Sequence, residues 1–306
     1  MPPEPVAPPP TDTLVRNTKI QLRPTQEAMF ACAGSTFSCL SPLLLSSRKF
    51  PIETISAVLD KDTGELTEYR GLMKNPKYCK LYAKLYTKDL GRLAQGMPRL
   101  VKGTNTIFSI PKKDVPLDRW RDVTYVRVAV NYRPEKDDPY QTRLTVGGNR
   151  LQYPGDCGNP TVDLLTVKLL INSVISTLGA WFMTIDIKDF YLNTPMARNK
   201  YMRLKLSNLP EDFAKEYNLA IKVTTDGYVY VEIRCGMYGL PHAGLMAQKF
   251  LEKILNKEGY HQSELTPGFW MHTWRPISFT LCVNDFGVKY VGKQHVEHLL
   301  SILKTD

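Results

Sequence analysis

Hydrophobic and polar residues change their spacing along the chain, and the spacing predicts a mixture of helices and strands. Residues 77–93 carry leucines at roughly helical intervals among lysines and arginines, which predicts an amphipathic helix with a basic face. Residues 160–178 predict a second helix with Asn159 as its N-cap. The patterns in residues 241–257 and 294–303 predict further helices.

Strands are expected where β-branched and apolar residues alternate with polar residues or form short runs. The expected strands cover residues 106–110, 124–132, 142–146, 181–187, 201–206, 277–283 and 286–291. Two hairpins are expected at residues 55–69 and 223–233, with turn signals at Asp62-Thr63-Gly64 and Asp226-Gly227. Because strands and helices do not alternate as regular βαβ units, the order favours the α+β class over a doubly wound parallel sheet.

Composition separates a proline-rich start from a longer part that can fold. Residues 1–24 are rich in proline with scattered charge, so we expect a disordered linker remnant. Residues 25–104 are expected to form an N-terminal extension with a helix, although residues 28–45 carry no assignable pattern. With 43% hydrophobic residues overall, the chain including residues 105–306 can bury a substantial core.

The balance of charges favours an anionic partner. Forty lysines and arginines stand against thirty acidic residues, which gives a formal net charge of +10. The isoelectric point near 9.2 agrees with this excess. Such a chain favours nucleic acid or an anionic membrane surface as a partner, although it is also compatible with a merely basic protein.

The sequence argues against several other kinds of site and location. The six cysteines lie far apart without CxxC spacing, and the histidines complete no zinc pattern beside them, so free thiols are expected. No apolar run reaches the roughly 18 residues of a membrane helix, and the first residues do not resemble a signal peptide. We therefore expect a soluble intracellular protein with no membrane partner.

Two acidic segments are candidates for chemistry. Asp186 lies in the middle of an expected apolar strand, where a carboxylate is costly to bury unless it is paired or binds a metal. Asn284-Asp285 marks a turn between two apolar strands, and pairing of these strands with that of Asp186 would bring the carboxylates together. Converging carboxylates suit two-metal phosphoryl transfer. Taken singly, Asp285 and Asp189 are also typical cap or turn residues, and Asp186 also fits a pair with a buried lysine or arginine.

Three segments in order resemble one known family. The segment TIDIKDFYLN is similar to the palm-strand motif of reverse transcriptases, and CGMYGLPHAG is similar to the stretch that opens the helix beneath the template. The segment FTLCVNDFGVKYVG resembles the paired-aspartate hairpin. Their order and separation are similar to those of copia-type retrotransposon reverse transcriptases, and weaker similarity extends back through TRLTVGG to about Leu90.

The resemblance implies a fold and a metal site. Residues 105–306 would form reverse-transcriptase-like fingers and palm, with an antiparallel palm sheet and helices packed on one face. Asp186 and Asp285 would be the catalytic carboxylates that hold two Mg²⁺ ions, with Mn²⁺ as an alternative. Because the chain ends at Asp306, soon after the hairpin, the thumb, connection and ribonuclease H parts are expected to be absent.

The resemblance also implies nucleotide-binding residues. Tyr191 would lie under the sugar of the incoming nucleotide, where its ring leaves no room for a 2′-hydroxyl. Arg143 would contact the triphosphate with its guanidinium fork. Asp189 and His242 complete the nucleotide-binding set, and each is also compatible with a purely structural role.

The implied activity is RNA-directed DNA polymerisation, in which a primer 3′-hydroxyl attacks the α-phosphate of a deoxynucleoside triphosphate. The implied partners are an RNA template with its DNA primer, the deoxynucleoside triphosphates and the rest of a retroelement polyprotein. The implied location is the cytoplasm, within a virus-like particle, with the nucleus as an alternative.

Two residues depart from the family pattern. Asn284 replaces the first aspartate of the pair, and an amide has neither the charge nor the bidentate capacity that a hard cation favours. His242 replaces a glutamine. The sequence therefore leaves three alternatives open: an active polymerase, an inactive retroelement relic that binds nucleic acid, and a basic interaction protein without a nucleotide site.

Overall fold

The structure, a computed structural model, describes residues 56–60, 63–134, 138–151, 155, 158 and 161–304. The predicted linker, residues 28–45 and Asn159 lie outside these ranges. Within them, the contacts divide the chain into two units rather than into an extension and a main domain. The first unit contains Val162–Asp189 and residues 254–304, and the second contains the described residues between 56 and 161 together with Phe190–Lys253.

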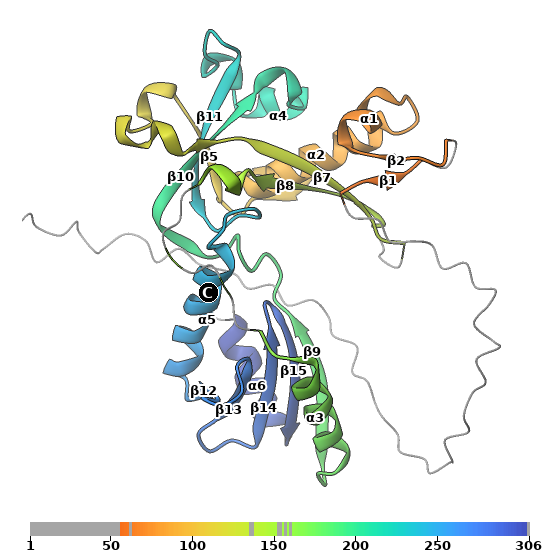
Figure 1. Cartoon of the computed structure of the whole chain (residues 1–306), viewed down its shortest axis with the longest axis vertical. Helices are drawn as coiled ribbons and strands as arrows, with labels where there is room; N and C mark the ends of the chain where they lie inside the picture. Colours follow the sequence, from red (N-terminus) through yellow and green to blue (C-terminus); the bar gives the residue numbers. More distant parts are fainter. Residues whose placement is uncertain are drawn as a thin grey trace, which may run out of the picture. The chain divides into compact units, whose positions relative to one another are not determined.

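A five-stranded sheet in the order β12-β13-β14-β15-β9 forms the first unit (Figure 1). All its neighbouring strands pair in antiparallel fashion. Its strands are β9 (Ala180–Asp186), β12 (Tyr260–Gln262), β13 (Phe269–His272), β14 (Ile277–Cys282) and β15 (Asp285–Val291). Its helices are α3 (Leu164–Ile175) and α6 (Lys293–Lys304), and α5 (Ala243–Lys257) crosses from the second unit into the first.

The helices α3 and α6 lie on opposite faces of this sheet. Lys289 of β15 donates to the carbonyl oxygen of Ser173 in α3 and to Oγ1 of Thr177, just after α3. Tyr260 hydrogen-bonds His298 of α6, and the register places Tyr260 on the face opposite to Lys289. The prediction of helices on one face is therefore wrong for this sheet, because both faces carry apolar residues that need cover.

Aromatic residues fill the core between this sheet and α6. Phe279 is fully buried and its ring lies 5.9 Å from that of Trp270 and 5.2 Å from that of Phe286, measured between centroids. Tyr260 contacts the same cluster at 5.7 Å. These rings come from four of the five strands, so they hold β12, β13, β14 and β15 together.

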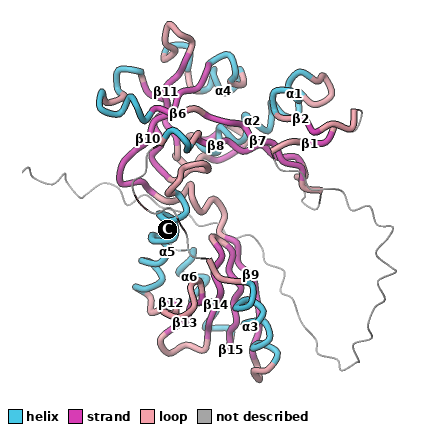
Figure 2. The backbone as a smooth tube through the Cα atoms, viewed as in Figure 1, coloured by secondary structure: helices cyan, strands magenta, loops and turns pink. Residues whose placement is uncertain are grey.

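The second unit combines a four-stranded sheet with short two-stranded sheets (Figure 2). The larger sheet has the order β5-β11-β10-β6, and only the β10–β6 pairing is parallel. Its strands are β5 (Ile107–Ile110), β6 (Val123–Thr124), β10 (Pro195–Lys205) and β11 (Tyr228–Cys235). The two-stranded sheets pair β1 (Val58–Leu59) with β2 (Leu66–Thr67), β3 (Gly96–Met97) with β4 (Val101–Lys102), and β7 (Val126–Tyr132) with β8 (Tyr140–Val146).

The helices of the second unit are α1 (Tyr69–Lys74), α2 (Cys79–Leu93), α4 (Glu211–Glu216) and the first part of α5. Short 3₁₀ turns cover Lys112–Asp114, Leu117–Asp122, Gly148–Arg150, Leu206–Asn208 and Leu219–Ile221. The core of this unit gathers residues from α2, β8, β10 and β11, among them Leu90, Leu144, Met202 and Ile233. It therefore joins segments from both sides of residue 104, where composition alone predicted a boundary.

Several predicted elements differ from the structure in detail. The buried face of α2 contains Tyr82 and Tyr86, whereas Leu81 is exposed, because tyrosine rings and not only leucines face the core. The N-cap of α3 is Asp163, whose carboxylate accepts the N–H of Thr166. The predicted hairpin at residues 223–233 is wrong, because β11 pairs with β10 and with β5.

The α+β class is confirmed by this mixture of helices with mostly antiparallel sheets. Among the helices that the structure describes, none is long and apolar enough to span a membrane.

We expect Phe279→Ala to lower the free energy of unfolding by about 3–5 kcal/mol, because it leaves a cavity among buried rings. Leu265→Ala, at a side chain that is 93% exposed, is the control and should change little. Urea denaturation of both variants measures the difference. Similar small effects would show that the ring cluster does not stabilise this unit.

Candidate functional site

Two carboxylates meet at one end of the first unit's sheet. Asp186 is the last residue of β9 and Asp285 is the first residue of β15, and the two are direct partners in the antiparallel register. Such partners project to the same face with Cβ atoms about 4.5–5.5 Å apart. Asp285 is exposed and Asp186 is partly buried. The strand pairing thus brings together the acidic residues that the sequence singles out.

Asn284 provides a polar partner for Asp186. Its Nδ2 donates to Asp186 Oδ1 at 2.5 Å and to the carbonyl oxygen of Ile187 at 3.2 Å. The N–H of Ile187 in turn donates to the carbonyl of Asn284 at 3.0 Å. The sequence argument placed Asp186 inside an apolar strand where it needs a cation. In the structure Asp186 is the last residue of its strand, and its carboxylate accepts a hydrogen bond from the uncharged amide of Asn284.

The turn that carries Asn284 is strained. β14 and β15 pair as far as Cys282 and Asp285, so only Val283 and Asn284 form the connection. Val283 has φ of 61°, a left-handed conformation that is unusual for a β-branched residue. Two-residue hairpins of the II′ type normally place glycine at this position. Strain of this kind is concentrated at functional sites, where the surrounding structure maintains it.

The oxygen atoms at this turn could ligate one hard divalent cation only after the side-chain amide of Asn284 has rotated. Among the residues that the structure describes, no group of three or more histidine, cysteine or acidic side chains is arranged to hold a metal. The oxygens of Asp186, Asp285 and Ile187 are of the type that Mg²⁺ favours. The Nδ2 of Asn284 contacts two of these three residues. Metal binding therefore requires the amide to turn its oxygen inward.

Asp189 occupies a turn after β9. Its φ of 56° lies in the left-handed region, which aspartate tolerates better than most residues. It is the last residue of this segment of the first unit, and the chain enters the second unit at Phe190. Its position agrees with the turn role that the sequence left open beside a nucleotide-binding role.

In the second unit, Tyr238 joins Arg143 to Tyr191. The guanidinium carbon of Arg143 lies 4.3 Å from the centroid of the Tyr238 ring. The Tyr238 ring meets the Tyr191 ring edge to face, with centroids 5.5 Å apart. Sequence analysis did not assign Tyr238 to the site, although it lies in the CGMYGLPHAG segment. We call Arg143, Tyr191 and Tyr238 the Arg-Tyr-Tyr cluster.

Glycines allow the backbone segments around this cluster to approach closely. Val146 N–H donates to the carbonyl of Tyr238 at 2.8 Å. A Cβ atom on Gly148 would lie 2.1 Å from the carbonyl oxygen of Gly239, and one on Gly236 would lie 2.6 Å from that of Tyr191. No side chain fits at such distances, so these glycines are required for the observed packing.

His242 is buried just before α5 begins. Burial lowers the pKa of His242, and the nearby charge of Lys200 lowers it further. A lowered pKa favours the neutral imidazole at physiological pH, which can both donate and accept a hydrogen bond. The structure places His242 four residues after Tyr238, on the same segment of the chain.

Comparison of the sequence with protein-family models finds no match, and comparison with curated proteins finds none. Function must therefore be inferred from the residues of the chain and their geometry.

We expect Val283→Gly to raise the free energy of unfolding by roughly 1 kcal/mol, because glycine adopts a positive φ without the clash that valine suffers. Val291→Gly is the matched control. Val291 is also half-buried and lies on β15, but it has no positive φ, so its loss should destabilise the protein. Equal destabilisation by both variants, measured by urea denaturation, would contradict strain at the turn.

Proposed function

We propose that the chain contains the palm and fingers of an RNA-directed DNA polymerase similar to those of copia-type retrotransposons. The observation that carries this proposal is the pairing of Asp186 with Asp285 beside a tight hairpin. The order of the three sequence segments supports it. In this proposal the first unit carries the candidate metal-binding carboxylates, and the second unit carries the candidate nucleotide-binding residues.

Asp186 and Asp285 would hold the metal in this proposal, together with the carbonyl of Ile187. A bound Mg²⁺ would neutralise charge on the transferred phosphoryl group and increase the acidity of the primer hydroxyl. The contribution of the chain is to place carboxylate oxygens on one face of the sheet. Their rigid strand positions reduce the reorganisation needed when charge develops.

The Arg-Tyr-Tyr cluster would bind the nucleotide. The guanidinium of Arg143 stacks on the ring of Tyr238, which fixes its plane and leaves its in-plane N–H groups to bind phosphate oxygens. Tyr191 contacts the same ring and would lie under the sugar, where it excludes a 2′-hydroxyl. Tyr238 thereby keeps the phosphate-binding and sugar-binding groups in one arrangement.

The template and primer would be bound through their backbones. The net charge of +10 favours a polyanion, and a polymerase must accept every sequence. The proposed partners are therefore an RNA template with a DNA primer and the deoxynucleoside triphosphates. Other parts of a retroelement polyprotein are further proposed partners.

The Asn284 contacts favour a second candidate function, that of an inactive relic which folds and binds nucleic acid. An amide that donates to both Asp186 and Ile187 satisfies these oxygens without a metal. It also removes one of the charges that attract a divalent cation. Incorporation of nucleotide by the unaltered protein on a primed RNA template separates the two candidates, because the relic incorporates none.

We expect Asn284→Asp to create a Mg²⁺-dependent stability. A third carboxylate beside Asp186 and Asp285 adds repulsion that lowers the stability of the variant in the absence of metal. Mg²⁺ should restore it and raise the Tm of the variant more than that of the parent, as differential scanning fluorimetry would measure.

The control for this experiment is the swapped double variant Asp186→Asn with Asn284→Asp. It again pairs one amide with one carboxylate, so it should fold as the parent does and lack the Mg²⁺ response. On a primed RNA template, Asn284→Asp alone should raise incorporation by orders of magnitude if the rest of the site is intact. Equal Mg²⁺ responses of the parent and Asn284→Asp would refute the metal assignment.

We expect Arg143→Ala to weaken the binding of deoxythymidine triphosphate by tenfold or more, because charge-assisted contacts to phosphate are strong. Arg203→Ala is the matched control, since Arg203 also stacks on a tyrosine, Tyr228, at 4.6 Å. Isothermal titration calorimetry measures both affinities. Unchanged binding by Arg143→Ala would exclude the proposed nucleotide site and favour a basic interaction protein.

A further inference from the structure

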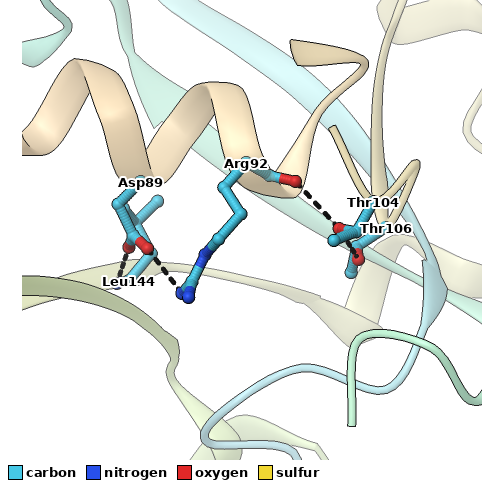
Figure 3. Close-up of polar contacts among 5 residues, drawn as sticks. All are labelled: Asp89, Arg92, Thr104, Thr106 and Leu144. Atoms are coloured by element: carbon cyan, nitrogen blue, oxygen red, sulfur yellow. Dashed lines mark hydrogen bonds and ion pairs between the residues drawn. The ribbon is translucent and has the colours of Figure 1, made fainter. Parts of the chain in front are cut away.

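A buried carboxylate joins α2 to β8, the strand that carries Arg143. Asp89 lies on α2, and its side chain is only 6% exposed. Its Oδ2 accepts the backbone N–H of Leu144 at 2.7 Å, and its Oδ1 accepts Nη2 of Arg92 at 2.7 Å (Figure 3). One carboxylate therefore links the backbone of a strand to a side chain of the helix.

The strand β8 depends on such a link. It belongs to a two-stranded sheet with β7, and an isolated pair of strands is marginally stable in water. The N–H of Leu144 donates to Asp89 across the helix–strand contact, where an unpaired buried donor would be costly. Asp89 thus supplies the hydrogen bond that a further strand would otherwise provide.

The end of α2 is itself anchored near this contact. The carbonyl oxygen of Arg92 accepts two hydrogen bonds from Thr104, one from its backbone N–H at 2.7 Å and one from its Oγ1 hydroxyl at 2.9 Å (Figure 3). The Oγ1 atoms of Thr104 and Thr106 lie 2.7 Å apart, and Thr106 is fully buried. These hydrogen bonds fix the C-terminal end of α2, to which Asp89 joins β8.

The charge of Asp89 agrees with this geometry. Burial raises its pKa, while the Arg92 guanidinium, the N–H of Leu144 and the charge of Arg143 act in the opposite direction. Both of its short contacts come from donors, and only the ionised carboxylate accepts at both oxygens. Arg143 is therefore linked to Asp89 in two ways: by the attraction between their charges, and through the hydrogen bond of its neighbour Leu144.

We propose that Asp89 is a positioning residue for triphosphate binding, which fixes β8 on α2 and thereby places the guanidinium of Arg143. This inference rests on the proposed role of Arg143 in the nucleotide site. It predicts that the affinity for a triphosphate depends on the length of the side chain at position 89, although this residue makes no contact with the ligand.

Asp89→Glu is the informative variant, because it keeps the charge and both acceptor oxygens but adds a methylene that shifts β8 relative to α2. A neutral residue would also change the long-range attraction for a highly charged triphosphate. The matched control is Asp138→Glu, at a carboxylate that is 78% exposed and pairs with Lys88 of the same helix at 3.5 Å.

The experiment is a double-mutant cycle between positions 89 and 143, with deoxythymidine triphosphate titrated calorimetrically well below each Tm. Asp89→Glu should weaken binding about tenfold in the parent, as expected when a charge-assisted contact moves by roughly an ångström. It should have no effect in the Arg143→Ala background. A role in stability alone would lower the Tm without this dependence on Arg143.

Several outcomes would overturn the proposal. Binding that depends on Arg143 but is unchanged by Asp89→Glu refutes the positioning role and leaves the proposed function standing, whereas a parent that binds no triphosphate refutes both. If Asp89→Glu does not fold, Asp89→Asn replaces it. In Asp89→Asn, the loss of positioning should weaken triphosphate binding, whereas the loss of a negative charge by itself should strengthen it. Unchanged or tighter binding by Asp89→Asn therefore overturns the inference.

Discussion

The antiparallel pairing of β15 with β9 is the constraint on which the candidate metal site depends. It joins Asp285 to Asp186 in direct register, and a slip by one residue would send every β15 side chain to the opposite face. The register is fixed at both ends of β15. Lys289 is held by Ser173 of α3 on one face, while Phe286 is buried among aromatic rings on the other.

Asn284 gives Asp186 an uncharged hydrogen-bond partner at this end of the sheet. Two facing carboxylates repel each other unless a cation lies between them or one of them is protonated. The amide of Asn284 adds two N–H donors without adding charge, and it uses them on Asp186 and on the carbonyl of Ile187. These hydrogen bonds weaken the attraction of this end of the sheet for a metal, because two of the oxygens that would ligate a cation already accept them.

Much of the fold and part of the site follow from the sequence, for identifiable reasons. The strand with Asp186 and the strands around Asn284 are predicted because apolar runs bounded by turn residues are strong local signals. The pairing of β11 with β10 is missed, since Asp226-Gly227 suggests a local hairpin and the true partner is non-local. Tyr238 is overlooked because its role is defined only by its contacts with Arg143 and Tyr191, which are distant in the sequence. Local patterns reveal elements, but contacts between distant segments require the folded chain.

The core of the second unit crosses the boundary predicted at residue 104. Residues 25–104 follow a proline-rich start and are expected from the sequence to form an extension. Yet α2 lies among them, and its Asp89 supplies the hydrogen bond that holds the edge of β8. A strand that pairs only with β7 cannot place Arg143 by itself. Because Leu90 of α2 shares a core with Leu144 of β8, the Arg-Tyr-Tyr cluster needs this helix as much as it needs the strand. The smallest chain that retains the Arg-Tyr-Tyr cluster must therefore include α2.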